Sequence, residues 1–145
     1  MNFSKNIKVT RVVDAVVAGT SDQNGTSIDH QGFDGGVTFI VGFGVITGSA
    51  VTSVKAQTSS DNSNWNNVKD SDQTIADSDD TGVVILEVAK PLERYMRVVV
   101  LRGTQNAVID FGMAFQHSAK AEPVTHDATT VISSLLLTSP IEGTP

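Results

Sequence analysis

Two long segments of this chain, 37–45 and 107–116, alternate apolar residues with smaller or polar ones. One face of the first segment carries Val37, Phe39, Val41, Phe43 and Val45. One face of the second carries Ala107, Ile109, Phe111, Met113 and Phe115. A period of two residues is the repeat of a half-buried β-strand, not of a helix. Gly42 and Gly44 on the other face of the first segment indicate a bend or a close approach of another backbone.

The composition extends this prediction from two strands to the whole chain. The sequence has 20 valines, 9 isoleucines and 15 threonines, so 44 of its 145 residues are β-branched, against only 6 leucines and 4 glutamates. β-Branched side chains fit a pleated sheet and are mediocre helix formers. We therefore expect an all-β protein.

Turn signals divide the chain into about eight strands. We expect them at 8–17, 26–29, 37–45, 51–59, within 68–75, and at 83–88, 95–101 and 107–116. The segment 83–88 is apolar on both faces except for Glu87, which predicts a central buried strand. This spacing of strands and turns predicts an antiparallel β-sandwich of the jelly-roll type.

The character of the sequence changes after Gln116. We expect residues 1–116 to form the sandwich domain and 117–145 to form an extended arm, which contains three prolines and one apolar patch, 131–137. Such an arm needs a surface to lie on, either its own domain or a neighbouring subunit.

The charge and the missing residue types exclude several functions. Ten basic against sixteen acidic residues give a net charge of −6, with few of the clustered cations that nucleic acid requires. The chain has no cysteine, so disulfides and thiolate chemistry are excluded. We expect no membrane segment, because no apolar run is long enough. We also expect no secretory signal in 1–10, and hence synthesis in a cytoplasm.

The histidines and the acidic loop do not predict a catalytic or metal site. His30, His117 and His126 lie in no recognisable catalytic motif, and we expect them to be surface or capping groups. The aspartates of 70–80 match an EF-hand loop only in part, because Val88 stands where the loop needs Glu. We expect a solvated loop, no cofactor and no enzymatic activity.

Trp65 and a group of arginines have two interpretations each. Trp65, the only tryptophan, can stack on a sugar ring or cover one end of the sandwich core, and we favour the second. Arg94, Arg97 and Arg102 lie within nine positions. They indicate either a subunit contact with a carboxylate or an edge strand protected against aggregation, with equal weight.

Three features of the sequence belong together. The first is 51–61 (VTSVKAQTSSD) followed by 65–68 (WNNV), the second is 90–98 (KPLERYMRV), and the third is the C-terminal motif, 119–127 (AKAEPVTHD) closing with 139–144 (SPIEGT). Together they resemble the small capsid decoration (cement) proteins of tailed bacteriophages. The resemblance covers roughly residues 35–145, and its most specific part is the C-terminal motif. It implies a β-sandwich on the outer capsid surface that bridges major capsid proteins, with no catalytic residues.

We therefore expect a structural protein of the virion, made in the bacterial cytoplasm and placed on the capsid exterior. Its expected partners are the phage major capsid protein and itself, as a homodimer or homotrimer, and neither nucleic acid nor membrane. The expected contact residues are Arg94, Arg97, Arg102, Pro123, His126, Leu135 and Leu136. The alternatives are a neck or tail structural protein and a carbohydrate-binding sandwich that uses Trp65.

Overall fold

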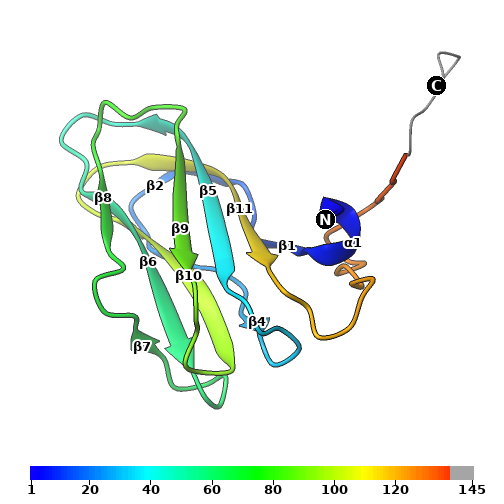
Figure 1. Cartoon of the computed structure of the whole chain (residues 1–145). Helices are drawn as coiled ribbons and strands as arrows, with labels where there is room; N and C mark the ends of the chain where they lie inside the picture. The colour runs from blue at the N-terminus through cyan, green and yellow to red at the C-terminus, as the bar shows by residue number, and fades with distance from the viewer. Residues whose placement is uncertain (138–145) are drawn as a thin grey trace, which may run out of the picture.

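A computed structural model describes residues 1–137 of the chain (Figure 1). A single helical turn, α1 (Phe3–Asn6), precedes eleven strands. These are β1 (Lys8–Val13), β2 (Val16–Gly19), β3 (Gln23–Asn24), β4 (Ile28–Asp29), β5 (Val37–Ile46), β6 (Thr52–Ser59), β7 (Asn66–Asn67), β8 (Gln73–Ile75), β9 (Val83–Val88), β10 (Tyr95–Arg102) and β11 (Ala107–Gln116).

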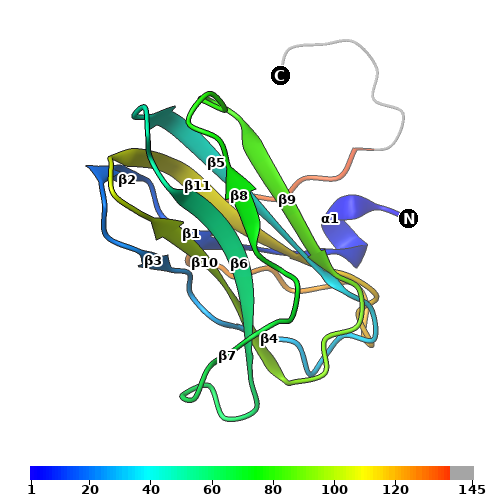
Figure 2. The same ribbon diagram turned by 90° about the vertical axis from the view of Figure 1, so that its left-hand side faces the viewer.

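The strands form two antiparallel sheets that pack face to face (Figures 1 and 2). Sheet A has the order β1-β11-β5-β9, with β2 also pairing with β11. Sheet B has the order β3-β10-β6-β7, with β4 beside β10 and β8 beside β6. When β1 with β2, β3 with β4, and β7 with β8 each count as one strand, the order is that of a jelly roll. The predicted all-β sandwich is confirmed.

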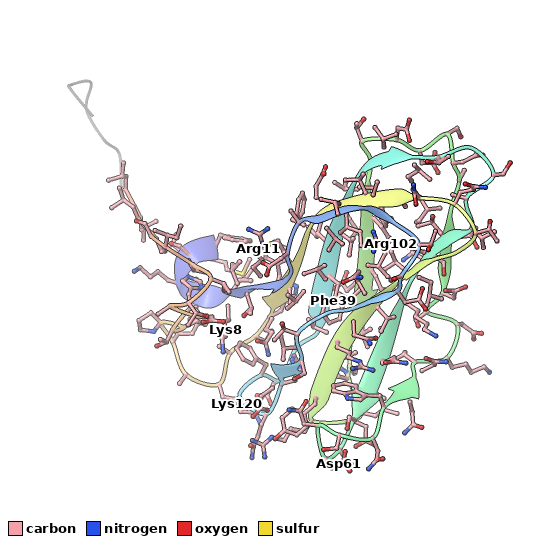
Figure 3. All side chains as sticks on the ribbon, turned by 180° about the vertical axis from the view of Figure 1, so that it is seen from behind. Lys8, Arg11, Phe39, Asp61, Arg102 and Lys120 are labelled. Carbon is pink, nitrogen blue, oxygen red and sulfur yellow. The ribbon has the colours of Figure 1, made fainter. Side chains whose placement is uncertain are left out.

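The inner faces of the central strands make the core. In β5, Val37, Phe39, Val41 and Phe43 are at most 1% exposed, and Figure 3 shows Phe39 within the sandwich. They face the equally buried Met96, Val98 and Val100 of β10. Each such side chain stabilises the fold by about 1.5–3 kcal/mol relative to an exposed one. In β5 the predicted alternation is that of core and outer face as far as Phe43, but Val45 is 62% exposed and Ile46 is buried instead. In β11 the predicted single apolar face is wrong: Ala107 and Ile109 lie in the core, whereas a register shift after Ile109 turns Phe111, Met113 and Phe115 to the outer face.

The first predicted strand, 8–17, is wrong in its extent. The chain bends at Asp14, whose side chain is 91% exposed and pairs with Arg11 at 3.2 Å. The segments β1 and β2 on either side of the bend both pair with β11. The two segments therefore lie along the same partner strand, β11, but the register of β1 against β11 shifts between Arg11 and Val13.

The predicted central position of 83–88 is also wrong. The segment forms β9, which lies at the edge of sheet A and pairs only with β5 in the described part of the chain. Val83 and Ile85 are 60% and 59% exposed. A strand that is apolar on both faces can be buried on both, but here one apolar face is left at the surface.

The glycines of β5 accommodate side chains of β11 and not another backbone. A Cβ atom at Gly42 would lie 2.5 Å from the Phe111 ring, and one at Gly44 would lie 2.9 Å from Val108. Glycine is needed at both positions because these side chains lie flat across the outer face of sheet A. The close approach predicted here exists, but its partner is a ring and a valine.

Candidate functional site: the C-terminal arm and the arginine strand

The arm begins by following the loop that precedes β5. The backbone N–H of His117 donates to the carbonyl of Gly36 at 3.0 Å, and the N–H of Lys120 donates to Gly32 at 2.9 Å. The Lys120 ammonium lies 3.3 Å from the carboxylate of Asp34. The first residues of the arm therefore belong to the sandwich, as one of the two predicted arrangements requires.

The arm then covers the open edge of β1. The Nδ1 atom of His126 accepts from the backbone N–H of Val9 at 3.1 Å, while its Nε2–H donates to the Ser4 carbonyl at 3.0 Å. The hydroxyl of Thr130 accepts from the N–H of Arg11 at 3.3 Å. An edge strand exposes a row of such N–H groups that can pair with other chains. Side chains of the arm occupy two of them here, and His126 is the centre of this attachment.

The attachment ends at a small turn. The carboxylate of Asp127 accepts from the backbone N–H of Thr129 at 2.9 Å and from its hydroxyl at 2.6 Å. These bonds lower the pKa of Asp127 below its ordinary value. The N–H of Val131 donates to the Asp127 carbonyl at 2.8 Å. The arm is therefore ordered by its own hydrogen bonds as far as Val131.

Beyond this turn the arm presents apolar side chains to solvent. Ile132 is 100% exposed, and Leu135, Leu136 and Leu137 are 75%, 41% and 61% exposed. We call residues 131–137 the tail. The proposed contact residue Pro123 is also exposed. The prolines at 140 and 145 and the motif 139–144 lie outside the described residues, and the described arm contains no strand.

Arg94, at the start of the arginine strand β10, pairs within the chain. Its guanidinium donates to both carboxylate oxygens of Asp29, with a shortest distance of 2.6 Å, and lies over the Tyr95 ring at 4.9 Å. The hydrogen bond from Arg94 lowers the pKa of Asp29. Both side chains are nearly half exposed, so the pair adds little stability. It does fix the position of a surface cation.

Arg97 lies on the outer face of sheet B. Its Nε–H donates to the amide oxygen of Gln57 at 2.8 Å, and its guanidinium carbon is 4.4 Å from the centroid of the Trp65 ring. Desolvation lowers the pKa of Arg97. Trp65 therefore packs on the outer face of sheet B. It does not lie over the end of the core, which is the position that the sequence favours.

The loop that carries Trp65 is built around one carboxylate. Asp61 accepts from the backbone N–H groups of Asn64 and Ser63 at 2.8 and 2.9 Å, and from the side chains of Ser59 and Asn64. The bond from Asn64 leads the causes that lower the pKa of Asp61 far below its ordinary value. Figure 3 shows Asp61 at the end of the molecule where this loop lies.

Arg102 is an interior residue. It is 4% exposed, and its guanidinium donates to the carbonyls of Ser21, Val17 and Ala107 at 2.7–2.9 Å. It thereby ties the connection between β2 and β3 to the core (Figure 3). The sequence shows no sign of this role, because Arg102 ends the strand that carries the surface residue Arg97 and directly follows the surface residue Arg94.

The three arginines thus have three different environments. The interpretation of their strand as a protected edge is wrong, since β10 lies between β6 and the pair β3 and β4. Arg94 and Arg97 remain at the surface of sheet B, whereas the arm follows the β1 edge of sheet A. Of the predicted contact residues, Arg102 is therefore buried and offers no contact surface, and the others divide between two separate surfaces.

The groups considered for catalysis or metal binding are engaged in local hydrogen bonds. His30 binds the carbonyl of Gly35 at 2.8 Å, and His117 binds the hydroxyl of Thr38 at 2.9 Å. In the acidic loop, Asp77 and Asp80 accept from the backbone N–H groups of Ser49 and Ile46. Within residues 1–137, no three His, Asp or Glu side chains gather as metal ligands would.

The described part of the chain has no helix that is long and apolar enough to cross a membrane. No protein-family model, curated protein or solved structure gives a significant match to the sequence or the fold.

Proposed function

We propose that this chain is a structural protein of the virion that decorates the outer surface of a tailed-phage head. The observation that carries the proposal is the arm. Hydrogen bonds through His126 and Thr130 hold it against β1, and it then leaves the domain with its leucines exposed. Exposed apolar segments of this kind mark binding sites for other proteins. The resemblance of the sequence to cement proteins names the partner, the major capsid protein.

The proposed mechanism is preferential binding. A protein that binds the mature shell more tightly than the immature shell or the free subunits stabilises the mature shell by mass action. Many copies on a symmetric surface add avidity to modest single contacts. Under this proposal the tail and the cations Arg94 and Arg97 supply the contacts with capsid subunits or with neighbouring copies of this chain on the shell, and the sandwich holds them in place.

The carbohydrate-binding alternative has a specific obstacle. Jelly rolls occur in lectins as well as in viral capsids, so the fold does not decide between them. Stacking on a sugar requires an open ring face, and Arg97 already lies over one face of Trp65. We therefore rank sugar binding below capsid decoration. A neck or tail protein would share the architecture and would differ in copy number.

The proposal is tested by binding to purified mature shells in a sedimentation assay. The informative variant ends at Val131, because a cut at residue 119 would also remove His126 and Thr130 and uncover β1. We expect the full chain to sediment with the shells and the shortened chain to remain in solution while keeping its fold. Undiminished binding of the shortened chain would contradict the role of the tail.

The matched control is Val17→Ser, which alters an exposed apolar residue (83%) outside both proposed contact surfaces. It should bind like the unchanged protein. Failure of the full chain to bind mature shells at any concentration would contradict the proposed function itself.

A further inference from the structure

The outer face of sheet A carries apolar side chains on each of the strands β1, β11, β5 and β9. The strand register places Met113, Ile40 and Ile85 side by side in one row. A second row begins with Val9 and Phe115. We call this surface the outer face; its apolar members are Val9, Ile40, Val83, Ile85, Phe111, Met113 and Phe115. Phe3 of α1 extends it, with its ring centroid 5.7 Å from that of Phe115.

This surface departs from the usual pattern of a two-layer sandwich. An antiparallel sheet with one face in the core normally presents polar side chains on the other. Sheet B follows that pattern around Arg97, Gln57 and Lys55. On sheet A, Val83, Ile85 and Phe3 are 54–60% exposed. A contiguous apolar surface of this kind on a protein marks an interaction site.

The same chain carries an apolar segment that matches this face. The tail contains Val131, Ile132 and three leucines, and it has no ionisable side chain. Lying on the outer face would therefore bury no unpaired charge. The charged groups of the face are Arg11 and Glu87, in the outermost strands β1 and β9, and Asp110 of β11, whose carboxylate lies beside Gly44. A tail that follows the row of Met113, Ile40 and Ile85 would avoid Asp110 and meet Arg11 only at the edge of the sheet.

The length of the tail suits the width of the sheet. Seven extended residues span roughly 23–25 Å. Crossing from β1 to β9 takes three strand spacings, or roughly 14–15 Å. The tail can therefore reach across the whole outer face of a sheet.

The tail leaves the domain in a direction that leads away from the sheets of its own copy. The bonds of Thr130 to Arg11 and of Val131 to Asp127 fix the point of departure beyond the β1 edge. In Figure 1 the last described residues run past α1 and away from both sheets. Exchange of an arm between identical chains is a low-cost route to a closed oligomer, because it buries both elements in every copy.

We propose that the tail of one copy docks on the outer face of sheet A of a second copy. The proposal stands independently of capsid binding, because self-association can be measured with the purified chain alone. The proposed contact would bury both the tail and the outer face, which are exposed in the isolated chain.

Site-specific crosslinking tests the contact directly, because the chain has no cysteine. Two variants, Ile85→Cys and Leu136→Cys, are mixed and treated with a short bismaleimide, and the linked peptides are identified by mass spectrometry. We expect a crosslinked dimer that joins position 85 of one chain to position 136 of the other. The matched control is Val51→Cys, which is equally exposed (62% against 59%) but lies outside the outer face.

Three results would overturn the proposal. The first is linkage of 85 to 136 no stronger than in the Val51→Cys control. The second is linkage within one chain of a double variant that carries both Ile85→Cys and Leu136→Cys, which would place the tail on its own sheet. The third is a product dominated by 85-to-85 linkage, which would mean that two outer faces pack together.

Light scattering gives an independent readout. The full chain should self-associate, and the variant Leu135→Asp with Leu136→Asp should do so at least about tenfold more weakly. The variant should fold normally, because its changed side chains are exposed in the isolated chain. A full chain that stays monomeric at every concentration, or a variant that associates equally well, would contradict the proposal.

Discussion

The guanidinium of Arg97 lies over the ring of Trp65, with its central carbon 4.4 Å from the ring centroid. A strand residue and a loop residue 32 positions apart in the chain therefore form one unit, which Gln57 completes through the Nε–H of Arg97. A cation–π pair of this kind contributes about 0.5–1 kcal/mol at an exposed site. Its larger effect is to hold the loop 61–67 against sheet B.

Arg97→Met should release Trp65 from this position. We expect a red shift of the tryptophan emission and a loss of about 0.5–1 kcal/mol in the free energy of unfolding. Because Trp65 is the only tryptophan, the fluorescence reports this site alone. The matched control, Arg94→Met, removes the neighbouring cation and should leave the emission unchanged. An unshifted emission in Arg97→Met would contradict the stacked arrangement.

The loop that carries Trp65 should stay ordered in moderately acidic solution. Hydrogen bonds to the charged form lower the pKa of Asp61 when the chain is folded. The ionised carboxylate of Asp61 therefore stabilises the loop fully above the ordinary carboxyl pKa, near 4. This stabilisation is lost as the pH falls through the lower pKa that Asp61 has in the folded chain. The unchanged protein should keep its tryptophan emission at about pH 3.5.

Asp61→Ala should instead show the released emission at neutral pH, with no dependence on acid in this range. The comparison with Asp72→Ala, an exposed aspartate of the acidic loop, controls for the change in net charge. A loop that loosens in the unchanged protein at pH 5 would contradict the assignment of Asp61.

Arg102→Met should be the most destabilising change among the arginines. The substitution leaves the buried carbonyl of Ala107 and the partly buried carbonyls of Ser21 and Val17 without their donor. Removing hydrogen bonds to a charged group and leaving buried acceptors unpaired costs about 2–4 kcal/mol. Chemical denaturation of Arg102→Met beside Arg94→Met measures the difference. Equal stability of the two variants would contradict an interior role for Arg102.

His126→Ala should detach the arm from β1. The substitution removes the acceptor for the Val9 N–H and the donor to Ser4, a loss of about 1 kcal/mol per hydrogen bond. Hydrogen exchange should become faster at Val9 and Arg11. Thr125→Ala, an exposed neighbour in the arm, is the control and should leave both rates unchanged. Protection that survives in His126→Ala would mean that the arm is not what covers the edge.

The sandwich could be predicted from the sequence because most of each central strand follows a period of two. The predicted ranges of β5 and β11 lie within one residue of those observed, although the alternation changes its buried face once in each strand. Local pattern is sufficient where each strand has one core face.

The errors have a common cause, which is that local pattern does not specify neighbours. The apolar run of β9 is compatible with a central strand, but its position depends on which strands pair with β5. The burial of Arg102 depends in the same way on carbonyls more than 80 positions away. The stacking of Trp65 on Arg97 likewise requires the loop to fold over sheet B.

The arm was recognisable from its composition, but its attachment was not. The change of character after Gln116 and the apolar patch 131–137 are visible in the sequence. The bond between His126 and Val9 joins residues 117 positions apart, and a single histidine gives no indication of such a partner. The outer face of sheet A could not be predicted because Phe111, Met113 and Phe115 share a period of two with the buried Ala107 and Ile109, and the register shift that turns them outward leaves no sign in the sequence.

Under the proposed function a tailed phage encodes this chain, and the number of copies of the chain in each purified particle of that phage tests this central claim most directly. Quantitative mass spectrometry against the major capsid protein measures it. Capsid decoration predicts hundreds of copies, in a fixed ratio to the capsid subunits, because each symmetric site on the shell binds one. A dozen copies or fewer would place the chain in the neck or tail, and its absence from particles would contradict a structural role in the virion.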